Sequence, residues 1–68
     1  MNGKIFELSD LDSGSKAIVI VRDVDVGIGL TISLEQNGDV EVIIPKELAG
    51  LIGQLLMDLA KGTRLPPS

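Results

Sequence analysis

Paired carboxylates are the side chains whose spacing could best support acid–base chemistry or a metal. The pairs are Asp10/Asp12 and Asp23/Asp25. Two residues apart, the members of a pair would share one face of a strand, but both pairs lie among residues typical of loops. A catalytic carboxylate needs a pocket that shifts its pKa, and a small domain offers little depth. We therefore interpret both pairs as solvated loop acids.

The residues that other common catalytic chemistries need are absent from the chain. The chain has no histidine and no cysteine, so the usual nucleophile–base arrangements, disulfides and common zinc, copper and iron ligand sets are excluded. Gly27-Ile-Gly29 lacks the third glycine and the following helix of a dinucleotide-binding fingerprint. We expect no catalytic residues, no cofactor and no metal site, and hence a protein that is not an enzyme.

Length and charge narrow the classes of protein to which the chain can belong. The 68 residues form one small domain, and Phe6 is its only aromatic residue, so valine, isoleucine, leucine and alanine must build the core. A net charge of −4, with scattered lysines and arginines, argues against nucleic-acid binding. No apolar run approaches the ~20 residues that span a bilayer. We expect a cytoplasmic protein that does not bind membranes.

Hydrophobic patterning predicts an α+β fold, an antiparallel meander of about four strands packed against one C-terminal amphipathic helix (ββββα). The helix is opened by Pro45 and ended by Gly62. Residues 1–62 form the single domain, and residues 63–68 form an extended tail. The expected strands are Lys4–Leu8, Ala17–Val21, Gly27–Glu35 and Asp39–Ile44.

Side-chain alternation predicts how the second and third strands pair. A four-residue loop, Arg22–Asp25, places Val21 opposite Val26 and keeps the apolar residues on one face. The same register places Ile20 opposite Gly27 on the other face.

The following hairpin is predicted to have a three-residue loop, Gln36–Gly38. Gly38 takes the position that needs a positive φ, and Leu34 pairs with Val40. A stripe along the helix, the leucine stripe, is expected to cover the apolar face of the sheet. Its members are Leu48, Leu51, Ile52, Leu55, Leu56 and Leu59.

Two sets of residues exceed what a monomeric ββββα unit needs, and a domain of this size is marginal alone. We expect both sets to form interfaces in a homo-oligomer. The alternative is that the small helix residues only border the contact between the chain's own helix and sheet, and that the isoleucines only shield the glycine backbone. One set lies on the second face of the sheet and the other beside the leucine stripe. They are Ile18, Ile20, Gly27, Gly29, Thr31 and Ile43, and Ala49, Gly53 and Ala60.

Gly38–Leu48, followed by Ile52-Gly53, resembles the strand–Pro–Lys–Glu–helix segment of AbrB/MazE-type swapped-hairpin transcription factors. The resemblance covers about a quarter of the chain. In that family basic residues face DNA and the helix is short, whereas this chain is acidic and its predicted helix is long. DNA binding is not implied for this chain.

The leading hypothesis is a small, non-enzymatic, oligomeric protein that acts by protein–protein contact. Small acidic proteins of this kind are often inhibitors or adaptors, including viral (phage) inhibitors of host defence. One alternative is a protein that sequesters a small, nucleotide-like anion between protomers through Lys4, Lys16 and Arg22. Another is an acidic mimic of nucleic acid, using Asp23, Asp25, Glu35, Asp39 and Glu41.

Overall fold

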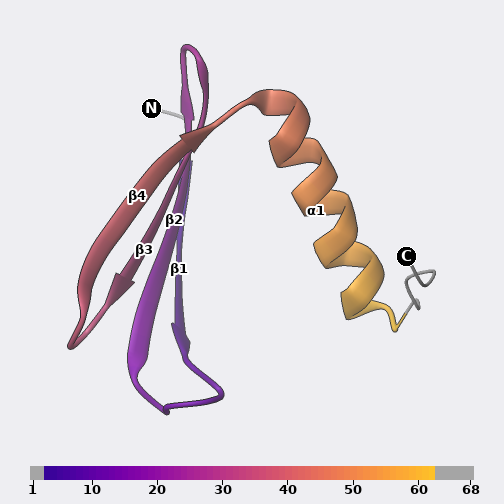
Figure 1. Ribbon diagram of the computed structural model, residues 1–68. Coiled ribbons are helices and arrows are strands. Elements are labelled where there is room, and N and C mark those ends of the chain that lie inside the picture. The colour runs from indigo at the N-terminus through magenta and orange to yellow at the C-terminus, as the bar shows by residue number, and fades with distance from the viewer. Residues whose placement is uncertain (1–2, 63–68) are drawn as a thin grey trace.

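The computed structural model, which describes residues 3–62, is one four-stranded antiparallel sheet followed by a single helix (Figure 1). The strands lie in chain order, so the predicted ββββα meander is confirmed. The predicted tail, residues 63–68, lies outside the described residues. The elements are β1 (Gly3–Ser9), β2 (Lys16–Val24), β3 (Gly27–Leu34), β4 (Gly38–Ile44) and α1 (Lys46–Ala60).

Strand pairing separates the sheet into an apolar and a mixed face, because successive side chains alternate between faces. One row of paired positions runs Phe6, Val19, Ile32 and Val40 across all four strands. We call this side the inner face; its apolar members are Phe6, Leu8, Ala17, Val19, Val21, Ile28, Leu30, Ile32, Leu34, Val40, Val42 and Ile44. The opposite side, the outer face, carries Ile5, Glu7, Ile18, Ile20, Arg22, Gly29, Thr31, Ser33, Asp39, Glu41 and Ile43.

The predicted pairing of β2 with β3 was wrong. Strand β2 continues through Val24, and the turn is only Asp25 and Val26, so Val21 pairs with Leu30 rather than with Val26. Charge suggested a loop at Arg22, but its side chain lies on the outer face and is bound there to an acid. Because the partner shifts by an even number of residues, the other predicted pairs keep their faces, but Val26 lies in the turn and not on the inner face.

The β3–β4 hairpin has the predicted loop length but a different loop. Gly38 has φ 79°, the positive value that was expected of it. The three connecting residues are 35–37, however, and Leu34 pairs with Gly38 rather than with Val40. Gly38 therefore serves as the first residue of β4, and the two faces again remain as predicted.

Helix α1 begins and ends at the predicted signals. Pro45 precedes it with φ −60° and ψ 148°, an extended conformation that proline readily adopts, and Glu47 lies in the first turn near the positive helix end. At the C-terminus Gly62 has φ 83°, and its N–H donates to the Leu59 carbonyl. No described helix is long and apolar enough to cross a membrane.

The helix covers much less of the sheet than its leucine stripe predicted. It approaches the strands at only a few positions, on β3, and stands beside the sheet in Figure 1. None of its residues is buried, and Leu51 and Leu56 are 69% and 62% exposed. Ala17 is the one buried hydrophobic side chain among residues 3–62. The expectation that the stripe would close the core within one chain was therefore wrong.

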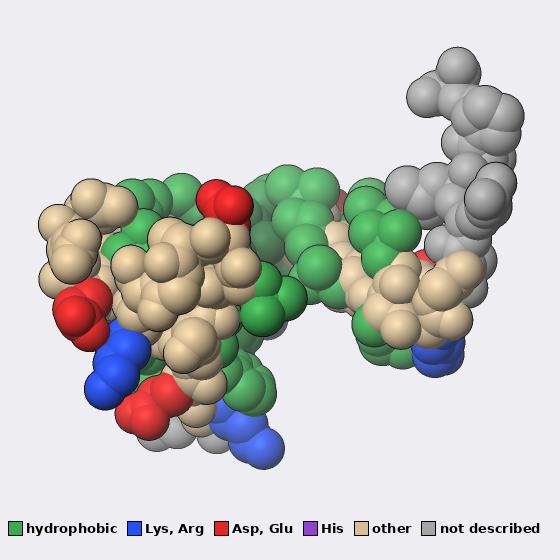
Figure 2. Space-filling view, turned by 90° about the horizontal axis from the view of Figure 1, so that it is seen from below, with side chains coloured by type: hydrophobic (Ala, Val, Ile, Leu, Met, Phe, Trp, Pro, Cys, Tyr) green, Lys and Arg blue, Asp and Glu red, His purple; other side chains and the backbone are tan. Residues whose placement is uncertain are grey.

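The described chain is correspondingly open in shape. Its radius of gyration is 13.7 Å, whereas a compact chain of this length has a radius of about 11 Å. In Figure 2 hydrophobic side chains gather where the sheet and helix lobes meet, and charged side chains are scattered around the edge of the sheet lobe. The apolar surface that should form a core is thus left largely accessible.

Candidate interaction surfaces

A polar network across three strands is the best-defined side-chain arrangement on the outer face. The Arg22 guanidinium binds the Glu41 carboxylate, with Nε 3.2 Å from Oε2. The Thr31 hydroxyl donates to the same oxygen over 3.1 Å. The Arg22 hydrogen bond, then the Thr31 hydrogen bond and the arginine's charge, lower the pKa of Glu41 below its ordinary 4.5. This network joins β2, β3 and β4 through groups that solvent still reaches.

Gly29 makes room for this network. A Cβ atom at this position would lie 3.1 Å from Cγ and 3.2 Å from Nε of Arg22, so the arginine side chain passes directly over the glycine backbone. At Gly27 an added Cβ would collide with the carbonyl oxygen of Ile44. Both glycines are buried, and each is explained by close approach of another part of the chain.

The predicted outer-face interface residues lie on one face, but not in the predicted pairs. Ile20 pairs with Thr31, and Ile18 pairs with Ser33, so neither lies opposite Gly27 or Gly29 as predicted, whereas Ile43 pairs with Gly29. Ile18, Ile20 and Thr31 are half-buried within the sheet. Ile43, at 52% exposure, is the most accessible large apolar member of the predicted set.

The small residues beside the leucine stripe lie in open surroundings. Ala49 and Gly53 are half-buried and Ala60 is exposed. A Cβ added at Gly53 would meet no atom within 4 Å apart from the neighbouring helix backbone. Within the described chain, therefore, no element uses the close approach that Gly53 permits.

The three cations proposed for an anionic ligand do not converge. Lys4 pairs with Val21 and shares the inner face, whereas Lys16 and Arg22 lie on the outer face. Six residues of β2 separate Lys16 from Arg22, a distance of about 20 Å along a strand. Arg22 is also occupied by Glu41.

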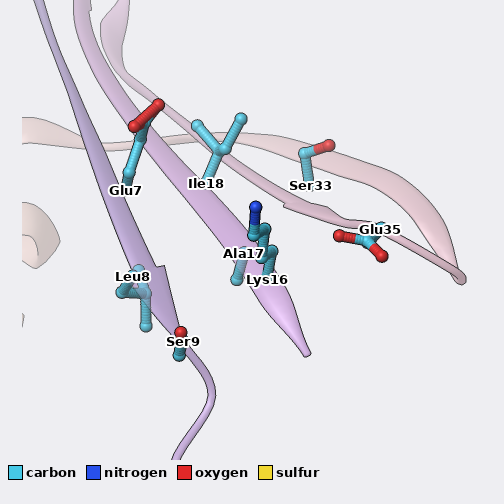
Figure 3. Close-up of a pocket in the computed structure, with 8 residues that line it drawn as sticks. All are labelled: Glu7, Leu8, Ser9, Lys16, Ala17, Ile18, Ser33 and Glu35. Atoms are coloured by element: carbon cyan, nitrogen blue, oxygen red, sulfur yellow. The ribbon is translucent and has the colours of Figure 1, made fainter. Parts of the chain in front are cut away.

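An open hollow at the end of the outer face was not predicted. It is lined by Glu7, Leu8, Ser9, Lys16, Ala17, Ile18, Ser33 and Glu35 (Figure 3). In Figure 3 Glu7 and Ile18 point to one side of the sheet and Leu8 points away from them. Two carboxylates surround a single lysine, so the hollow offers little attraction to an anion. Only the corrected pairing places Ser33 opposite Ile18 and brings Glu35 to Lys16, whose carbonyl accepts the Glu35 N–H.

Asp10 and Asp39 accept hydrogen bonds, and Asp23 lies in strand β2 rather than in the predicted loop. Asp10 accepts bonds from the Asp12 N–H at 3.0 Å and the Ser13 hydroxyl at 2.8 Å, which lower its pKa below the ordinary 3.8. Asp39 accepts a bond from the Ser33 hydroxyl. Within residues 3–62 no group of three acidic side chains is placed to hold a metal ion. The Asp10 bonds organise the β1–β2 loop.

Most of the exposed large hydrophobic side chains among residues 3–62 belong to the inner face or to the leucine stripe. Sequence reasoning assigned both to an internal core and so did not consider them as a candidate interface. Their exposed members include Phe6 at 51%, Val40 at 65% and Val42 at 47%, besides the helix residues given above. Contiguous apolar surface of this kind is typical of sites where proteins associate.

Comparisons with known proteins give no match: no family model, no curated protein and no solved structure matches the chain.

Proposed function

We propose that the chain is a small, non-enzymatic binding protein that assembles with copies of itself and acts by occupying the surface of another protein, as an inhibitor or adaptor does. The observation that carries this proposal is the accessible apolar surface of the inner face and the leucine stripe. A soluble chain that left this surface in water would lose the main driving force of its own folding.

The outer face supports contact with a partner. It carries half-buried isoleucines beside the hydrogen-bonded network of Arg22, Thr31 and Glu41. Such a mixture of apolar and hydrogen-bonding groups is common at protein interfaces. Ile43 projects from this face on the edge strand β4, where a partner can reach it. This face remains free when the inner face is covered.

The two alternatives have weaker support. Sequestration of an anion needs converging positive charge, but Lys4, Lys16 and Arg22 are spread over two faces. Mimicry of nucleic acid needs free carboxylates in a regular array. Glu41 is neutralised by Arg22, and Asp23 lies on the inner face whereas Asp39 and Glu41 lie on the outer face, so the acids do not form one array.

Native mass spectrometry of the gently purified protein separates these functions. A multiple of the chain mass with a bound second protein supports the proposal, and release of that protein by Ile43→Lys assigns the contact to the outer face. A co-purified nucleotide would favour sequestration instead. A particle of one chain that binds no protein at any concentration contradicts the proposal.

A further inference from the structure

We infer that a second copy of this chain covers the inner face and the leucine stripe, so that two copies form one two-fold core. The inference rests on the oligomeric part of the proposed function and assigns its surface, its partner and its symmetry. The outer faces of the two copies then point away from each other.

The exposed area is the first argument. The chain exposes 5730 Å², whereas a folded monomer of 7.2 kDa exposes about 4,100 Å². The excess is about 1,600 Å² per chain, or about 3,200 Å² for two copies, which lies within the range of obligate homodimer interfaces. One further copy is therefore enough to remove the excess.

The kind of residue left exposed is the second argument. A partner that associates only transiently buries a surface about as polar as the rest of a protein, whereas an obligate interface resembles a core cut in half. The inner face carries apolar residues on all four strands, with Lys4 and Asp23 as its charged members, and the six residues of the stripe are aliphatic. This composition favours a permanent partner.

The dimensions of the two surfaces are the third argument. Helix α1 has 15 residues and is about 22 Å long, and the strands have 7 to 9 residues and are about 23–30 Å long. A helix stripe and a sheet face of similar length can pack against each other along their full length. In a two-fold dimer each copy supplies both surfaces, so the contact is self-complementary and closes.

Two neighbouring residues of β4 offer a matched test. Val42 on the inner face is 47% exposed in the single chain, and Ile43 on the outer face is 52% exposed. Lysine at either position disturbs a single chain to a similar extent. In the dimer, Val42→Lys buries two unpaired charges, whereas Ile43→Lys leaves its lysine in solvent.

Sedimentation equilibrium of the full chain and both variants gives the readout. The wild type and Ile43→Lys are expected to be dimers at micromolar concentration, and Val42→Lys is expected to weaken association about a hundredfold or more. Because Val42→Lys could also unfold the chain, thermal unfolding of the wild type is followed by circular dichroism over a hundredfold range of concentration. Its midpoint is expected to rise with concentration.

A monomeric wild type with a concentration-independent midpoint would overturn the inference, as would equal effects of the two lysines on association. A higher oligomer disrupted only by Ile43→Lys would also overturn it, while leaving the proposed function standing. Conversely, a dimer that binds no other protein would leave the inference standing and contradict the proposed function.

Discussion

The Arg22 side chain on β2 crosses Gly29 on β3 and binds Glu41 on β4, so one ion pair spans three strands of the outer face. Substitution of Glu41 by glutamine keeps a hydrogen-bond acceptor but removes the charge. Because the pair is solvent-exposed, we expect only a small fall in melting temperature, and one that shrinks as salt is added. Glu7→Gln is the control, since Glu7 has no ion pair within the described chain. An equal fall for both variants would contradict this role.

The same contacts predict an acid-dependent loss of stability. The pKa values of Glu41 and Asp10 are lowered by hydrogen bonds, so both carboxylates favour the folded state while charged. Their contribution is complete above the ordinary values of 4.5 and 3.8, and it is lost as the pH falls through the lowered values. Urea unfolding between pH 7 and pH 2 measures this loss. Glu41→Gln should reduce the loss of unfolding free energy that occurs at acid pH. An unchanged loss would contradict the contribution assigned to Glu41.

Substitution of Gly29 by valine should displace Arg22 from Glu41. The added Cβ would lie 3.1 Å from Cγ of Arg22, which is too close unless the arginine moves. We expect the pKa of Glu41 to rise toward its ordinary value, and carbon-detected NMR titration of its carboxyl group can follow this. In a double-mutant cycle Gly29→Val should cost less stability when Glu41 is already glutamine. Strict additivity would show that Gly29 acts independently of the pair.

The two helix glycines should respond differently to alanine. A Cβ added at Gly50 or at Gly53 would meet no other part of the described chain within 4 Å, so each alanine should strengthen the helix by about 0.5–1 kcal/mol. Gly53 lies beside the leucine stripe, where the proposed second copy would approach, whereas Gly50 lies on the far side of the helix. We expect Gly50→Ala to raise the free energy of unfolding of the dimer by this full amount and Gly53→Ala to raise it by less. Urea unfolding at fixed protein concentration measures both values. Equal gains would exclude close approach at Gly53.

Local patterns predicted the elements and the faces well because alternation and turn chemistry act over a few residues. Gly38 took the expected positive φ value, and the helix follows Pro45 and ends before Gly62, as predicted. The pairing was less predictable, since a charged residue such as Arg22 can belong to a strand when a distant acid binds it. Glu41 is 19 residues away in the chain, and no local pattern joins the two.

The candidate surfaces were predictable only in part. Ile18, Ile20 and Ile43 were assigned to the outer face correctly, because an even shift of register leaves faces unchanged. The inner face and the leucine stripe were expected to bury each other within one chain. A hydrophobic pattern shows that a surface must be covered, but it carries no information on whether the same chain or another covers it.

The solvent accessibility of Val42 in solution tests the central claim most directly. Because the chain has no cysteine, Val42→Cys and Ile43→Cys each introduce one unique thiol, and maleimide labelling reports its exposure. If a second copy covers the inner face, the thiol at position 42 reacts at least about tenfold more slowly than that at position 43, and dilution below the dissociation constant removes the difference. Equal labelling rates at both positions at every concentration would contradict the account.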